Sequence, residues 1–149
     1  MKKTIFILKT LFIYFLIFSN GAAEASSYFD NGKILFEKNE FEKSKIFFER
    51  DIVFNPKSEK SYLYLAKIFN KKDNKEAEET YLNNTLLLNP KNDEAIYMLV
   101  LLKIKQSNYD EAKKLIEKFD LVCNSFCNKK KEIKEKFDKL IPENAKSNN

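Results

Sequence analysis

The sequence of 149 residues contains no histidine and no tryptophan, and only two glycines, three prolines and two cysteines. Without histidine, the commonest general base and the commonest metal ligand are missing. Because folds made of many short strands need glycine and proline at their turns, the scarcity of both excludes such a fold. The sequence also has no glycine-rich phosphate loop and no nucleophile elbow. We therefore expect an all-α protein that is not an enzyme and binds no cofactor or metal.

The N-terminal residues 1–25 have the three parts of a secretory signal peptide: a basic start, an apolar run over residues 5–18 and a small, polar end. The expected cleavage site lies between Ala25 and Ser26, and cleavage before Glu24 is the second choice. The apolar run is shorter than the roughly 20 residues of a membrane-spanning helix. We expect an exported, periplasmic protein; the alternative is an uncleaved N-terminal anchor, which would be its only membrane contact.

The charge of the chain gives little information about partners. Cleavage would remove three lysines and one glutamate, which lowers the formal net charge from +5 to +3. A nucleic-acid-binding protein needs a concentrated basic face, so we expect no nucleic-acid partner.

Helix-breaking residues recur with one period along the mature chain. Asn55-Pro56 and Asn89-Pro90 are 34 residues apart, and each follows an apolar stretch. A second series pairs a capping residue with a carboxylate three positions later, in the manner of a capping box, with starts 34 and 35 apart. Its members are Asn39 with Glu42, Asp73 with Glu76, and Asn108 with Glu111. Two such series predict a helical repeat.

On these residues the chain resembles the tetratricopeptide repeat (TPR) family, whose unit is a 34-residue pair of antiparallel helices, A and B. The first repeat places Gly32 at the small residue of helix A, Ser44 where helix B usually has alanine, and Phe48 in the middle of helix B. The second repeat fits best with Ala77 and Tyr81 in helix B, one residue early, which implies a shorter turn before that helix. Departures from the family pattern are Asp51 and Thr85 at alanine positions and Lys103 at an aromatic position.

The resemblance implies an α-solenoid of about three helix-turn-helix TPR units and a C-terminal capping helix. The capping helix would present Ile133, Phe137 and Leu140 on one face, to cover the last apolar surface of the stack. The expected segments are a signal peptide over 1–25, repeats over 26–58, 59–92 and 93–124, the capping helix over 125–141 and a disordered tail over 142–149.

In this family the A helices line a concave groove that binds peptides, so the resemblance implies that the partner is another protein or a peptide segment. Lysines around apolar contacts favour a partner with acidic character. The expected groove residues are Phe29, Lys33, Phe36, Leu63, Lys67, Asn70, Lys71, Tyr97, Leu101, Ile104 and Lys105. A competing interpretation is that Phe36, Leu101 and Ile104 pack against neighbouring helices.

The chaperone-binding members of the family clamp a C-terminal carboxylate with a lysine and asparagine pattern. That pattern is missing here. The corresponding pairs are Phe29/Lys33, Leu63/Lys67 and Tyr97/Leu101. Chaperone tails are therefore not the expected ligand.

The only cysteines, Cys123 and Cys127, flank the expected end of the third repeat. We favour a disulfide that joins the capping helix to that repeat, because an exported protein meets an oxidising environment. Thiol-redox chemistry is the alternative, although the C-x3-C spacing differs from the C-x-x-C of thioredoxin-like proteins. Metal binding is least favoured, since two cysteines without histidine cannot complete a tetrahedral site.

Two functions follow from these expectations. The favoured one is an exported, non-enzymatic interaction module, a scaffold or adaptor that assists assembly of an envelope complex through its groove. The alternative is a thiol-redox helper in the periplasm that uses the cysteine pair.

Overall fold

The computed structural model describes residues 21–140, and side chains from residue 28 onward. Most of the expected signal peptide and the whole expected tail lie outside these residues. Seven α-helices and one short 3-10 helix make up the described part, which contains no strand, so the all-α prediction is confirmed. Their bounds are α2 Gly21–Glu37, α3 Phe41–Phe54, α4 Glu59–Lys71, α5 Lys75–Leu88, α6 Asp93–Lys105, α7 Tyr109–Val122, η1 Cys127–Lys129 and α8 Lys130–Leu140.

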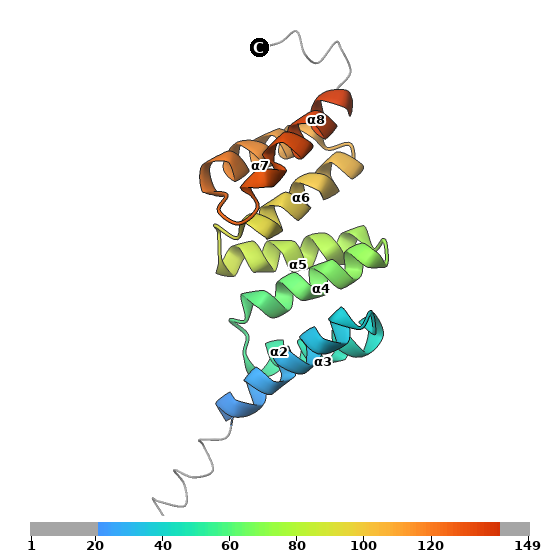
Figure 1. Ribbon diagram of the computed structural model, residues 1–149, viewed down its shortest axis with the longest axis vertical. Helices are drawn as coiled ribbons and strands as arrows, with labels where there is room; N and C mark the ends of the chain where they lie inside the picture. Colours follow the sequence, from blue (N-terminus) through green and yellow to red (C-terminus); the bar gives the residue numbers. More distant parts are fainter. Residues whose placement is uncertain (1–20, 141–149) are drawn as a thin grey trace, which may run out of the picture. The chain divides into compact units, whose positions relative to one another are not determined.

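The chain divides into two compact units, Met1–Ser61 and Tyr62–Asn149. In the first unit, α2 and α3 form an antiparallel pair (Figure 1). They approach closely at Gly32, where an added Cβ atom would lie only 2.8 Å from Cε1 of Phe48. The hydroxyl of Ser44 donates a 2.8 Å hydrogen bond to the carbonyl of Gly32 across the same contact. A small residue at position 32 is therefore required by packing, as the repeat pattern predicts.

The three B helices, α3, α5 and α7, have 14 residues each and begin 34 residues apart, at Phe41, Lys75 and Tyr109. Each buries residues at the same three positions of the repeat. These residues are Ser44, Phe48 and Asp51 in α3, Glu78, Leu82 and Thr85 in α5, and Ala112, Ile116 and Phe119 in α7. The register is thus unbroken from the first repeat to the third.

This register corrects the expected alignment of the second repeat. Ala77 and Tyr81 are only partly buried, and the core positions belong to Glu78 and Leu82. The turn before α5 is as long as the other two turns. The error arose because Glu78 occupies the position of a small residue, and alanine one position earlier gave the better match to the family pattern.

The turns between A and B helices also correct the expected capping series. Asn39, Asp73 and Ser107 have positive φ angles of 60°, 55° and 59°, so they end the A helices in the left-handed conformation instead of capping the B helices. The N–H groups of the following residues reach back to the carbonyls of Leu35, Phe69 and Lys103, at 2.9, 3.0 and 2.9 Å, as in a Schellman motif. Asparagine and aspartate tolerate this conformation better than most residues.

The B-helix N-caps are the residues that follow, Glu40, Asn74 and Asn108. The Asn74 side chain accepts a hydrogen bond from the N–H of Ala77, and the Asn108 side chain accepts one from the N–H of Glu111. Asn108 also donates to the Glu111 carboxylate at 2.9 Å. Of the three expected capping residues, Asn108 alone is an N-cap, and its side chain accepts the expected hydrogen bond from the N–H of Glu111.

Buried polar side chains at the alanine positions find local partners. Asp51 of the first unit accepts a hydrogen bond from the buried hydroxyl of Ser61. Thr85 of the second unit donates to the carbonyl of Tyr81 at 2.9 Å. Both departures from the family pattern are thus compensated by hydrogen bonding.

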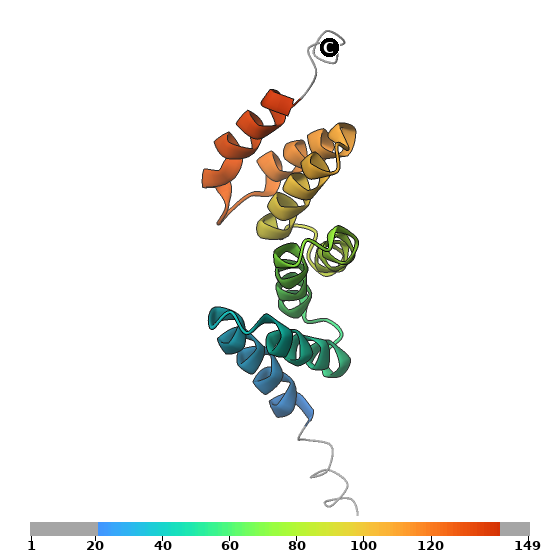
Figure 2. The same ribbon diagram turned by 90° about the vertical axis from the view of Figure 1, so that its right-hand side faces the viewer.

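The second unit has two neighbouring apolar clusters. One joins α4, α5 and α6 around Ala66, Leu82 and Leu99. The other joins α6, α7 and α8, and α8 contributes Ile133 and Phe137 to it. Both views show α8 running alongside the α6–α7 pair (Figures 1 and 2). The expected capping helix therefore covers apolar surface with two residues, whereas Leu140 is 50% exposed.

Candidate peptide-binding surface

In the first unit, three of the expected groove residues lie on α2. Phe29 is half-buried, and its ring centroid lies 5.8 Å from that of Phe48. Phe36 is also half-buried and meets a phenylalanine of α3 edge-on. Lys33 is exposed, with its ammonium 3.9 Å from the carboxylate of Glu37. This part of α2 offers two partly accessible aromatic rings and one solvated lysine.

On α4, the expected groove residues differ in accessibility. Leu63 is only 7% exposed and belongs to the apolar cluster around Leu82. Lys67 forms a 2.8 Å ion pair with Glu94 of α6 and lies 4.7 Å from the ring centroid of Tyr64. Lys71 is exposed. The packed Leu63 side chain is therefore unavailable to a ligand in this conformation.

Asn70, also expected in the groove, donates a 2.9 Å hydrogen bond to the carboxylate of Glu78. Glu78 is only 2% exposed, at the position that Ser44 and Ala112 occupy in the other repeats. Burial raises the pKa of Glu78, and the hydrogen bond from Asn70 opposes that rise. The expected alignment of the second repeat gave the core position to Ala77, so it did not predict that Glu78 is buried.

On α6, Ile104 is 7% exposed and Leu101 is half-buried, and both contact the cluster that includes α8. The competing interpretation, packing against neighbouring helices, describes both residues in this structure. Lys105 is exposed and binds the carboxylate of Asp73. This contact lowers the pKa of Asp73 and raises the pKa of Lys105.

Lys103, which stands at an aromatic position of the family pattern, is buried to 5% exposure and bonded to two carboxylates. Its ammonium lies 2.6 Å from Glu79 and 3.0 Å from Glu111. Burial lowers the pKa of Lys103, but the two hydrogen-bonded carboxylates raise it overall. Because Lys67 and Lys105 are also paired, part of the positive charge that favoured an acidic partner is balanced within the chain, whereas Lys33 and Lys71 are exposed.

Tyr97 of α6 is covered by the capping helix. Its hydroxyl donates a 3.0 Å hydrogen bond to Glu132, which also accepts from Lys129 and Lys136 at 2.8 and 2.9 Å. The hydrogen bonds from Lys129, Lys136 and Tyr97 lower the pKa of Glu132 to about 2. Tyr97 therefore takes part in docking α8, a role that its place on helix A did not reveal.

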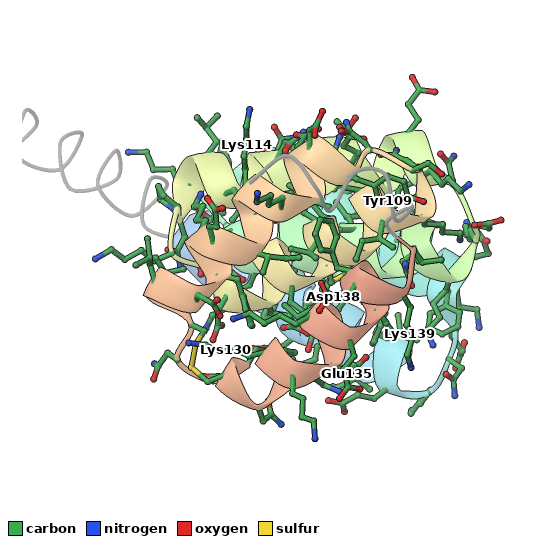
Figure 3. The ribbon with its side chains drawn as sticks, turned by 90° about the horizontal axis from the view of Figure 1, so that it is seen from above. Tyr109, Lys114, Lys130, Glu135, Asp138 and Lys139 are labelled. Carbon is green, nitrogen blue, oxygen red and sulfur yellow. A yellow bond between two sulfur atoms is a disulfide. The ribbon has the colours of Figure 1, made fainter. Side chains whose placement is uncertain are left out.

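The segment between α7 and α8 contains the cysteine pair. The sulfur atoms of Cys123 and Cys127 lie 2.09 Å apart, near the start of α8 (Figure 3). Within this loop the N–H groups of Asn124 and Phe126 donate to Oδ2 of Asp93, at 2.7 and 2.8 Å. Burial raises the pKa of Asp93, but the backbone donors outweigh it and lower the pKa.

Residues 21–140 contain no group of three or more cysteine or carboxylate side chains placed to hold a metal ion. No helix in that range is long and apolar enough to cross a membrane.

Of the expected groove residues, α2 carries three and the second unit carries the remainder.

Several solved structures are similar to this chain. The second TPR of Spaghetti (RPAP3), bound to the HSP90 peptide SRMEEVD, shares 20% identity with a TM-score of 0.62, and the match covers 66% of this chain and 92% of that one. The type III secretion translocator chaperone SycD of Yersinia enterocolitica shares 9% identity with a TM-score of 0.71, over 80% of this chain and 84% of that one. The Sgt2 TPR domain from Aspergillus fumigatus shares 16% identity with a TM-score of 0.66, over 78% and 80%.

No family model and no curated protein matches the sequence. The similar structures therefore define the class of fold: the chain is an all-α protein with the TPR α-solenoid fold.

Proposed function

We propose that the chain is an exported, non-enzymatic interaction module that assists assembly of an envelope complex by binding a segment of another protein. The TPR fold supports binding as the general function, since the similar RPAP3 structure contains a bound HSP90 peptide. The observation that carries the proposal is the pair of half-buried rings, Phe29 and Phe36, on α2. Aromatic side chains dominate the binding energy of many protein interfaces.

The ion pair of Lys67 bears on which kind of partner segment the surface would bind. Since Lys67 is paired with Glu94, an acidic ligand would have to displace an existing ion pair. We therefore propose a partner segment that contributes apolar or aromatic side chains, with acidic residues as a secondary feature.

The proposed location is the periplasm, after cleavage before Ser26 or Glu24. The N-terminal basic, apolar and small-residue pattern supports export. Intact-mass measurement on protein extracted from the envelope tests it: a chain beginning at Ser26 or Glu24 is expected. A chain that retains Met1 in the membrane fraction would instead support the anchored alternative.

A photo-crosslinking amino acid placed at Phe29 in the producing cells tests the binding surface. The same amino acid at Lys139, an exposed residue of α8, is the matched control. We expect a defined adduct from position 29 and none from position 139, and weaker capture of the identified partner by purified Phe29→Ala. Equal adducts from both positions would contradict the assignment of this surface.

The thiol-redox alternative has no support from the similar structures, which include a peptide-bound TPR and a translocator chaperone.

A further inference from the structure

The loop between α7 and α8 is held by two separate constraints. The cysteine pair closes it, with the Cα atoms of Cys123 and Cys127 5.2 Å apart. A single carboxylate oxygen of Asp93, in the first turn of α6, accepts hydrogen bonds from two N–H groups inside that loop, those of Asn124 and Phe126. Charge-assisted hydrogen bonds of this kind are stronger than neutral ones.

The loop conformation also positions the start of the capping helix. The centroid of the Phe126 ring lies 5.8 Å from that of the Tyr97 ring. The ammonium of Lys129 also lies 5.8 Å from the centroid of the Tyr97 ring. The next turn brings Glu132 to the Tyr97 hydroxyl. Because these contacts follow one another along residues 126–132, the geometry of the loop contributes to how α8 meets α6, beside the buried contacts of Ile133 and Phe137.

We propose that Asp93 and the Cys123–Cys127 pair form a redox-sensitive latch for the capping helix. Closing the disulfide and docking the loop on Asp93 strengthen each other, and together they hold α8 over Tyr97. The coupling is reciprocal because both events favour the same loop conformation: whatever Asp93 adds to disulfide formation, the disulfide adds to the Asp93 contact.

Formation of the disulfide requires a disulfide oxidant, and oxidised glutathione is the one used in the test below. One cysteine thiolate attacks a sulfur of oxidised glutathione, which forms a mixed disulfide and releases one glutathione thiolate. The second cysteine thiolate then attacks the cysteine sulfur of the mixed disulfide and releases the other glutathione thiolate. The pair loses two electrons, and one oxidised glutathione becomes two reduced molecules.

Reduction weakens the latch without removing it. The freed loop gains backbone conformations that are incompatible with two N–H groups converging on one oxygen. Ile133 and Phe137 remain apolar in either state, so α8 keeps its buried contacts as the loop loosens. The expected change is faster local opening of residues 124–140 in a chain that stays folded.

The first test measures the equilibrium between the cysteine pair and glutathione in the full chain. Asp93→Asn keeps the shape of the side chain and removes its charge, so we expect the oxidation constant to fall about fivefold or more. Glu94→Gln is the matched control, because Glu94 is the next residue of the same turn and pairs with Lys67. The control should change the constant by less than about twofold. An unchanged constant in Asp93→Asn would overturn the coupling.

The second test needs no substitution at Asp93. Hydrogen exchange is compared between the oxidised and reduced wild-type chain, with the Cys123→Ser, Cys127→Ser double variant as a permanently open reference. We expect exchange in residues 130–140 to accelerate about fivefold or more on reduction, while exchange in α5 stays the same. Equal exchange of α8 in both redox states would show that the pair does not act on the capping helix.

Discussion

The side-chain amide of Asn70 donates a 2.9 Å hydrogen bond to the carboxylate of Glu78, which lies buried between helices at a position where the other repeats have serine and alanine. The hydrogen bond satisfies one oxygen, but burial still raises the pKa of this carboxyl group. The second repeat thus contains a charge that folding disfavours at neutral pH.

Replacing Glu78 by glutamine should stabilise the protein. The substitution keeps the volume and the acceptor for Asn70 and removes the charge, so the free energy of unfolding at pH 7 should rise by about 1 kcal/mol. Because the folded pKa is raised, Glu78 favours the folded state most at a pH below its unfolded pKa, and that contribution is lost as the pH rises through the folded pKa. Urea denaturation should therefore show a larger gain from Glu78→Gln at pH 7 than at pH 4. A gain that did not change between these pH values would contradict this account.

A second prediction concerns the close contact of α2 and α3. Gly32→Ala places a methyl group 2.8 Å from Phe48, which is fully buried and cannot move aside freely. Overpacking should exceed the gain in helix propensity and lower the free energy of unfolding by about 1–2 kcal/mol. Asp30→Ala, at an exposed position of the same helix, is the control and should change stability by less than about 0.5 kcal/mol. Equal stability of both variants would show that the helices separate easily at this point.

The class of fold could be predicted from the sequence because it depends on composition and on residues that are close together along the chain. Few glycines and prolines exclude a strand-rich fold, and the two Asn-Pro steps end α3 and α5 at one period. The register of α5 was missed because Glu78 has the chemistry of a surface residue and the burial of a core residue. Leu87 and Leu121 are the opposite case, since they have the chemistry of core residues but are 80% and 86% exposed.

The candidate surface was predicted less well because accessibility depends on distant partners. Lys105 is paired with a residue 32 positions earlier, and Tyr97 with one 35 positions later. Neither pairing can be predicted from the spacing of residues along one helix. The sequence could place these residues on A helices, but only the packing of α6 against its neighbours shows which side chains are already engaged.

The Tyr97 hydroxyl should contribute to the low pKa of Glu132. In Tyr97→Phe the Lys129 and Lys136 contacts remain, so the pKa of Glu132 should rise from about 2 but stay below its ordinary value of 4.5. A lowered folded pKa stabilises the protein above the unfolded pKa, and that contribution is lost as the pH falls through about 2. Carboxyl carbon NMR titration measures the shift. Tyr109→Phe, whose ring packs on Phe137, is the control and should leave the Glu132 pKa unchanged. No rise in Tyr97→Phe would remove the hydroxyl from the set of groups that hold Glu132 ionised.

The last prediction is that this chain does not bind the peptide that a structurally similar protein binds. The RPAP3 repeat was solved with the HSP90 peptide SRMEEVD, whose last residue is acidic. In this chain the pairs that would form a carboxylate clamp are Phe29/Lys33, Leu63/Lys67 and Tyr97/Leu101. Leu63 is buried, Lys67 is bound to Glu94, and Tyr97 is bound to Glu132. Of the two lysines in these pairs, Lys67 is engaged and only Lys33 is exposed, so the set of basic and amide groups that would clamp the peptide terminus is incomplete.

Isothermal titration of the full chain with SRMEEVD should accordingly show no saturable binding up to a peptide concentration of about 1 mM, which corresponds to less than about 4 kcal/mol of binding free energy. The RPAP3 repeat, titrated with the same peptide, is the positive control. The Glu94→Gln variant tests whether the ion pair with Glu94 is what keeps Lys67 from the peptide, because the substitution frees Lys67. If the wild-type chain bound the peptide with micromolar affinity, and Lys67→Ala abolished that binding, the chain would have a carboxylate clamp of its own, and the proposal of a mainly apolar partner segment would be wrong.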